Sequence, residues 1–308
     1  MTNKNIIVWV VVIIIIVIGI MAIFSRNSNT TVSTNSHTVE IIAAENFWGS
    51  LISQLGGTHV NVVSIVSDPN ADPHEYESST TNAREVATAD YVIENGAGYD
   101  SWMEKLLSAG GNSNRKVLNA ADLLNKKDGD NPHFWYYPQY VNQVIAQMEK
   151  DLVAIDPTNA DYYNSQYALL QNALKPYQDR VASIQKQYDG TKIAATESIF
   201  VYPTQALGLD LVSPTQFMNA IDEGNDPTAL SVIQFENLLK NNQVKVLVYN
   251  EQTVTPITLT MKKLAGDANI PVVGITETIQ PPDTSFQDWM NSELINLENA
   301  LNSNALGK

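Results

Sequence analysis

Short apolar runs recur along this chain, and segments with helical features separate them. Strands that are apolar at almost every position, instead of at every second one, are typical of parallel sheets that helices cover on both faces. The alternation therefore predicts an α/β fold with parallel sheets. The expected strands are Val39–Ala44, Val60–Val66, Tyr91–Glu94, Val117–Leu118, Ile193–Ala195, Leu211–Val212, Val244–Tyr249 and Pro271–Ile275.

A pattern of strand, turn, helix and glycine stop occurs twice. Ile41–Trp48 leads to Gly56, and Lys192–Phe200 leads to Gly208. A repeated opening of this kind indicates two lobes. The chain has 308 residues, of which 44% are hydrophobic, so it can form two cores of ordinary size.

A long helix is expected between the two lobes. Pro157 suits the first helical turn, Gly190 supplies a stop, and the apolar residues between them follow helical spacing. Pro176 lies inside this segment and is expected to kink it. About 30 residues of helix extend roughly 45 Å, so the helix can cross from one lobe to the other and permits only small lobe movements. The expected boundaries are 38–155 for the N-terminal lobe, 156–190 for the linking helix and 191–308 for the C-terminal lobe.

The N-terminus carries an apolar run of 19 residues, Ile6–Phe24, with Lys4 before it and Arg26 after it. This length suffices to span a bilayer as a helix. A cleaved secretory signal usually has a shorter apolar stretch followed by small residues, so an uncleaved anchor is the favoured interpretation and a cleaved signal is the alternative. We assign residues 1–25 to the signal or transmembrane anchor and 26–37 to a flexible tether rich in Ser, Thr and Asn.

Composition excludes several function classes. The chain has no cysteine, which rules out disulfides, thiolate metal sites, cysteine nucleophiles and lipid attachment through an N-terminal cysteine. Any metal site must therefore use nitrogen and oxygen ligands. The formal net charge of −15 argues against a nucleic-acid partner, which would need clustered Lys and Arg. An acidic surface either attracts cations or keeps an exported domain soluble.

Two of the four histidines follow a proline in turn-rich segments, Asp72–Tyr76 and Asn131–Trp135. A proline restricts the backbone before each histidine, so His74 and His133 are candidates for a preorganised metal site. Each Pro-His pair alone is also compatible with an exposed turn. The other two histidines are interpreted as non-ligands, because one lies in the tether and the other begins a strand.

Carboxylate ligands are expected in the second lobe, because open parallel sheets bind ligands at the carboxyl ends of their strands. Glu197 and Glu277 each follow an expected strand at such an end. Other acidic residues also lie at strand ends or in loops and stay open as candidates: Glu45, Asp72, Asp222, Glu223 and Glu251. The residues by themselves therefore indicate a possible His/carboxylate metal site and nothing more specific.

Three motifs allow a more specific interpretation of the chain. Asp72–Glu77 (DPHEYE), Ala89–Trp102 (ADYVIENGAGYDSW) and Asn131–Trp135 (NPHFW) resemble the zinc/manganese solute-binding proteins of ABC transporters, the metal-binding cluster A-I family. The resemblance extends from about Val39 to Leu301. It implies two lobes, each with a parallel β-sheet flanked by helices, joined by one long linking helix, with a metal in the cleft. It also implies the ligands, which are His74 and His133 from the first lobe and Glu197 and Glu277 from the second.

The chain departs from that family in four respects. Glu277 stands where the family has Asp, and the usual lipid-bearing cysteine is missing, which makes the N-terminal anchor its expected substitute. The His-rich acidic loop of many zinc-specific members is also missing, since Gly110–Asp130 contains no histidine. Phe217–Pro227 aligns with the family only at its end.

The resemblance implies a non-enzymatic role as the substrate-binding component of an ABC importer. The cargo would be one divalent transition metal, Mn2+ or Zn2+, and Glu at position 197 instead of His leans the choice toward manganese. The expected partners are an ABC permease and its cytoplasmic ATPase. The expected state is a monomer, tethered by its N-terminus to the extracellular face of the cytoplasmic membrane of a Gram-positive-like cell. The alternatives are a surface adhesin or structural protein, and a metallohydrolase with Glu75 or Glu197 as its base.

Overall fold

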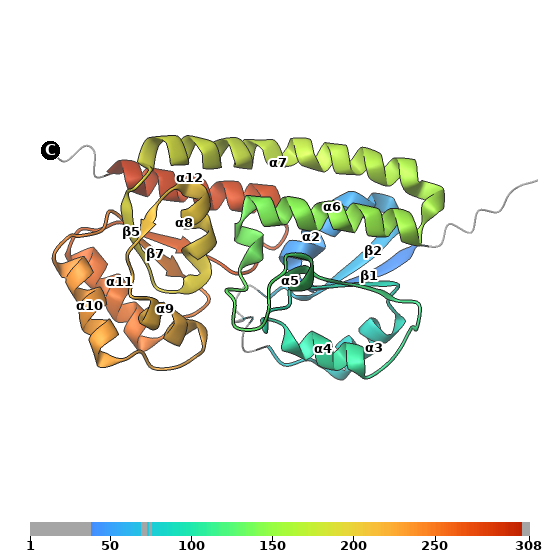
Figure 1. The fold of residues 1–308 in the computed structure, drawn as a ribbon, viewed down its shortest axis with the longest axis horizontal. Helices are drawn as coiled ribbons and strands as arrows, with labels where there is room; N and C mark the ends of the chain where they lie inside the picture. Colours follow the sequence, from blue (N-terminus) through green and yellow to red (C-terminus); the bar gives the residue numbers. More distant parts are fainter. Residues whose placement is uncertain (1–37, 69–72, 74–75, 304–308) are drawn as a thin grey trace, which may run out of the picture. The chain divides into compact units, whose positions relative to one another are not determined.

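The computed structural model describes residues 38–68, 73 and 76–303 (Figure 1). The predicted anchor and tether lie outside these residues, and so does His74. Among the helices that the structure describes, none is both long enough and apolar enough to cross a membrane.

The first lobe contains a four-stranded sheet in which every pair of neighbours is parallel. Its order is β2 (Val60–Val66), β1 (Val39–Glu45), β3 (Tyr91–Glu94) and β4 (Lys116–Asn119). Alternate residues of β1 point to opposite faces, as strand geometry requires. Ile41 and Ala43 join the core beneath α2, α6 and α7, while Ile42 and Ala44 pack toward α3 and α4. The helices are α2 (Asn46–Gly56), α3 (Thr80–Thr88), α4 (Ser101–Ser108), α5 (Ala120–Leu123) and α6 (Pro138–Ile155).

The second lobe repeats this architecture with another parallel four-stranded sheet. Its order is β6 (Asp210–Leu211), β5 (Lys192–Ala195), β7 (Leu247–Asn250) and β8 (Val272–Ile275). Ala194 and Leu247 face the core under α9, α10 and α11, whereas Ile193 and Val248 face α7, α8 and α12. The helices are α8 (Val201–Leu207), α9 (Thr215–Asp222), α10 (Ala229–Lys240), α11 (Pro256–Asp267) and α12 (Phe286–Ser303).

A helix of 29 residues, α7 (Ala160–Tyr188), connects the two sheets. It packs against α2 and α6 of the first lobe and against α8 and α12 of the second (Figure 1). The helix continues through Pro176, and its expected first turn is instead a 3-10 turn, Pro157–Asn159. Other 3-10 turns in the described part of the chain include Gly57–His59, Phe134–Tyr136 and Ser198–Phe200.

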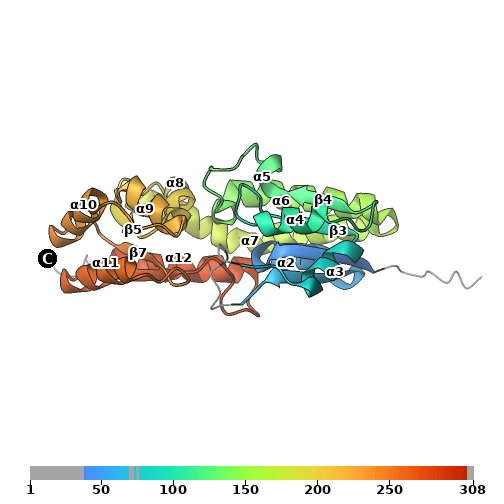
Figure 2. The ribbon, with the colours of Figure 1, turned by 90° about the horizontal axis from the view of Figure 1, so that it is seen from below.

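The predicted fold class is confirmed: two lobes with parallel sheets, flanked by helices and connected by one long helix. All eight expected strands are present; Val60–Val66 and Tyr91–Glu94 have the expected ends, and the ends of the others differ by at most three residues. The sequence did not indicate where the last helix lies. α12 runs beside α7 and also contacts α2 of the first lobe (Figure 2).

Candidate metal centre

Three polar side chains meet at the carboxyl edge of the second sheet. Glu197 follows β5, Asn250 ends β7 and Glu277 follows β8, and β7 lies between the other two strands. The Asn250 amide nitrogen donates to Glu197 Oε2 at 2.5 Å and to Glu277 Oε1 at 2.7 Å. Both carboxylates are buried, with exposed fractions of 1% and 0%. One amide therefore holds the two predicted carboxylate ligands together.

The orientation of the Asn250 amide is fixed by its other end. Its Oδ1 accepts a hydrogen bond from the backbone N–H of Gln252 at 2.9 Å, so the nitrogen must face the carboxylates. Gln252 in turn accepts from the backbone N–H of Glu277 at 2.6 Å and of Thr278 at 2.9 Å. The turn after β8 is thus built around side-chain acceptors, which set the position of Glu277.

His133 is fully buried in the first lobe, immediately before the turn Phe134–Tyr136. Its Nδ1 lies 2.9 Å from Asn131 Oδ1. The Asn131 nitrogen donates to the backbone oxygen of Ser198 at 2.7 Å, which identifies Oδ1 as the atom facing the imidazole. Because Oδ1 can only accept, Nδ1 carries the proton and Nε2 carries the lone pair that a metal would use.

Tyr99 connects His133 to the carboxylates. Its hydroxyl donates to Glu277 Oε2 at 2.7 Å, and its ring lies edge-on to the His133 ring with centroids 6.1 Å apart. Tyr99 belongs to the first lobe and Glu277 to the second, so the contact crosses the lobe junction. Among the described residues, no group of three or more His, Asp or Glu side chains lies close enough to hold a metal ion.

The loop that carries Tyr99 is held by a buried carboxylate. Asp100 accepts from the backbone N–H groups of Asn95 at 2.6 Å and Gly96 at 2.8 Å. Gly96 has φ +77°, and a Cβ there would come within 2.3 Å of the Asn119 side chain, so only glycine fits. The loop geometry therefore depends on Asp100 and on the absence of a side chain at position 96.

Two more acids surround Asp100. Burial, followed by the negative charge of Asp100, raises the pKa of Glu45 well above its ordinary value. The same two causes, in the same order, raise the pKa of Glu94 to about 7. Burial also raises the pKa of Asp100, although its backbone hydrogen bonds oppose this. All three acids are therefore buried next to the Tyr99 loop, where ionisation is disfavoured.

The other acidic candidates have different surroundings. Asp222 accepts from the backbone N–H of Ser198 at 3.1 Å, and Glu223 and Glu251 are exposed. Asp72 lies outside the described residues.

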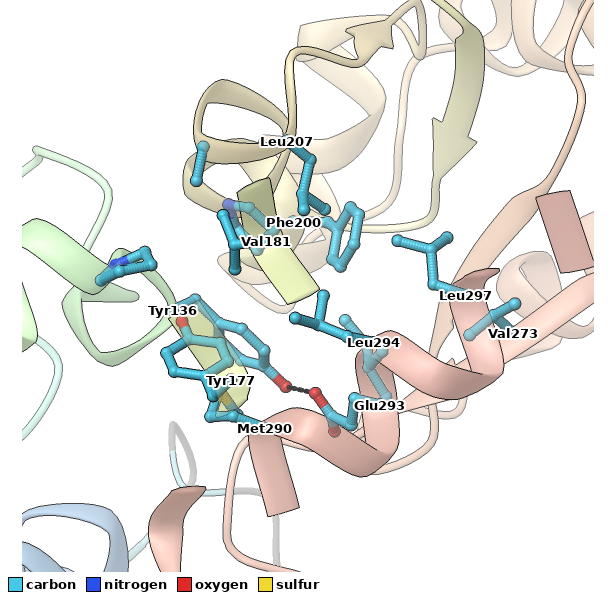
Figure 3. Close-up of a pocket in the computed structure, with 14 residues that line it drawn as sticks. Tyr136, Tyr177, Val181, Phe200, Leu207, Val273, Met290, Glu293, Leu294 and Leu297 are labelled. Atoms are coloured by element: carbon cyan, nitrogen blue, oxygen red, sulfur yellow. Dashed lines mark hydrogen bonds between the residues drawn. The ribbon is translucent and has the colours of Figure 1, made fainter. Parts of the chain in front are cut away.

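A further, partly buried carboxyl lies behind the turn that carries Glu277. Glu293 accepts from the Tyr136 hydroxyl at 2.7 Å and from the backbone N–H of Thr276 at 3.0 Å. Figure 3 shows it at the edge of an apolar cavity beside Tyr177 and Met290. Burial raises the pKa of Glu293 to about 8, although these hydrogen bonds favour the ionised form.

An open cleft of about 660 Å³ lies between the lobes. Tyr99, Asn131 and Ser198 are among its lining residues, and each contacts a predicted ligand or a neighbour of one. Asp130, Asp222 and Glu223 also line it and give it an acidic wall. Such a wall raises the local concentration of cations.

Comparison with known proteins identifies the class. A family model described as ZnuA, zinc-uptake complex component A periplasmic, matches residues 41–300. The chain therefore belongs to this family, which confirms the resemblance found in its motifs.

Two curated relatives and one solved structure illustrate the similarity. The manganese-binding lipoprotein MntA of Halalkalibacterium halodurans is 25% identical over 267 residues, covering 84% of this chain and 85% of that protein. The manganese ABC transporter substrate-binding lipoprotein PsaA of Streptococcus anginosus is 22% identical over 277 residues, with 83% and 85% covered. The substrate-binding protein FpvC from Pseudomonas aeruginosa in complex with Mn2+ has the same fold, with a TM-score of 0.71, 17% identity, and 86% and 99% covered.

The site also contains residues that the sequence did not single out. Asn250 follows an expected strand and Tyr99 lies within one of the family motifs, so the sequence shows where they stand. It does not show that they form hydrogen bonds to the carboxylates. Gln252 and Glu293 had no recognisable signal.

Proposed function

We propose that this protein is the substrate-binding component of an ABC importer and captures one divalent transition metal ion, Mn2+ or Zn2+, between its lobes. The main observation behind this proposal is a pair of buried carboxylates, Glu197 and Glu277. The Asn250 amide holds both of them at the carboxyl edge of a parallel sheet, where ligands bind. Buried carboxylates are costly unless positive charge compensates them. A divalent cation supplies that charge, and family membership supports the same role.

The proposed ligands are His74, His133, Glu197 and Glu277. Two neutral imidazoles and two carboxylates give zero net charge with a divalent ion, which suits a buried site. The tautomer of His133 supports this assignment, because Asn131 directs the proton to Nδ1. His74 is proposed from its motif alone.

The protein is proposed to act outside the cytoplasmic membrane as a monomer. Its curated relatives are named lipoproteins, but this chain has no cysteine to carry a lipid. Residues 1–25 would anchor the chain instead, and 26–37 would form the tether. The lobes, 38–155 and 191–308, with the linking helix 156–190, would then present the ion to a permease and its cytoplasmic ATPase.

Calorimetric titration of the metal-stripped full-length chain with Mn2+ and Zn2+ tests the proposal. One-to-one binding is expected in the wild type, with large losses in His133→Ala and Glu277→Ala. Glu236→Ala, which removes a carboxylate paired with Lys240 on α10, should leave binding unchanged. Absence of binding in the wild type would overturn the transport function and favour a surface adhesin.

A further inference from the structure

We propose that Tyr99 determines metal selectivity by limiting Glu277 to coordination through one oxygen. The inference rests on the proposed function, since it takes Glu277 as a ligand. The observation that supports it is that both oxygens of Glu277 already accept hydrogen bonds, Oε1 from Asn250 and Oε2 from Tyr99.

The two donors reach Glu277 from different parts of the molecule. Asn250 belongs to β7 of the same lobe, whereas Tyr99 comes from the first lobe across the junction. A carboxylate that binds an ion through both oxygens must turn both of them toward it. With Glu277 held from two sides, such a rotation strains or breaks at least one of these hydrogen bonds. Coordination through one oxygen can keep the bond to Tyr99.

Tyr99 cannot easily follow a rotating carboxylate. Its ring is buried, with 5% exposed, and packs against Trp135 at a centroid distance of 5.1 Å and against His133. Asp100, the next residue, is fixed by two backbone hydrogen bonds. The hydroxyl is therefore a rigid donor, and a hydrogen bond to a buried carboxylate is among the stronger kinds in proteins.

This restraint acts differently on the two ions. Zinc is satisfied by four ligands in a tetrahedron, so one oxygen from Glu277 suffices. Manganese favours oxygen-rich shells with more ligands, to which a second carboxylate oxygen would contribute. Tyr99 thus disfavours manganese relative to zinc. Its effect is opposite to that of Glu197, which as a carboxylate in place of His favours manganese.

The test compares the dissociation constants for Mn2+ and Zn2+ in the wild-type full-length chain and in Tyr99→Phe. The variant keeps the ring and loses only the hydroxyl. Its ratio of Kd for Mn2+ to Kd for Zn2+ should fall roughly tenfold, because the hydrogen bond to a charged group no longer competes with the second oxygen. Tyr163→Phe is the matched control, since it removes a similar bond to Asp156, 2.9 Å long, outside the site.

The possible outcomes are distinguishable. Equal weakening of both ions in Tyr99→Phe, or an unchanged ratio, would overturn the selectivity role while leaving the metal site in place. Wild-type binding that is absent, or unaffected by Glu277→Ala, would instead refute the assignment of the site. If Tyr99→Phe does not fold, a crystal structure of the Mn2+-loaded wild type decides: one Glu277 oxygen at coordination distance supports the proposal, and two overturn it.

Discussion

Replacing Glu94 with glutamine is expected to stabilise the protein at alkaline pH and to leave its stability unchanged near pH 4.5. The Glu94 side chain is buried, with 4% exposed, and one of its oxygens has no hydrogen-bond partner among the described residues. Asn119 donates to the other oxygen at 3.0 Å. Because burial and the charge of Asp100 disfavour the ionised form, the pKa of Glu94 rises from 4.5 to about 7.

The direction of the effect follows from proton linkage. In the unfolded chain Glu94 ionises near its ordinary pKa of 4.5, and in the folded protein only near about 7. Stability from the protonated carboxyl is therefore fully present below the first value and is lost as the pH rises through the second. At about 1.4 kcal/mol per pKa unit, the shift corresponds to a loss of about 3 kcal/mol across this window.

Glutamine is uncharged and nearly the same shape, so Glu94→Gln removes this loss. Urea unfolding at about pH 5 and about pH 8 measures it, and the variant should gain up to about 3 kcal/mol over the wild type at the higher pH. Glu251→Gln, at an exposed position directly after β7, is the control and should show no such gain. A difference between Glu94→Gln and the wild type that stays constant with pH would refute the reasoning.

Three further predictions concern the site and its loop. Asn131→Ala should weaken binding of Mn2+ and Zn2+ by about 10- to 100-fold in calorimetry, because the His133 tautomer loses its acceptor; an unchanged affinity would contradict the role of Asn131. Metal affinity should fall between about pH 7.5 and about pH 5.5 as protons compete for the imidazole, and a flat profile would count against histidine ligands. Gly96→Ala should lower the urea midpoint more than Gly98→Ala, because both have positive φ but only position 96 has an atom, of Asn119, 2.3 Å from the added Cβ. Equal effects would show that backbone conformation alone matters.

The parts of the fold that the sequence predicted correctly depend on local pattern. Each strand is a short apolar run, and α7 has a proline near its start, a glycine after its end and helical spacing between them. The position of α12 depends on distant partners instead. Its contacts with α7 and α2 join residues far apart in the chain, which no local pattern reports.

The candidate site likewise contains residues that local sequence indicates and residues that only the fold reveals. Glu197 and Glu277 became candidates because each follows a strand of a parallel sheet, where ligands bind, and the family resemblance selected them from the other acids. Asn250 has the same placement, but its importance appears only when β7 is known to lie between β5 and β8. Tyr99 required knowledge of the opposite lobe, because its acceptor is 178 residues away.

The contacts between the lobes bear on how an ion could leave. Asn46, Ser50 and Gln54 lie on one face of α2, at helical spacing. Asn46 bonds to Ile279, before α12, and the other two bond to the first two residues of α12. Gln54 and Gln287 form a reciprocal pair, at 3.2 Å and 2.8 Å. A wide hinge opening would break these bonds together with the Tyr99–Glu277 bond. A change confined to the loop that carries Tyr99 would break only the latter, so local rearrangement at the cleft disturbs the ligands at lower cost than separation of the lobes.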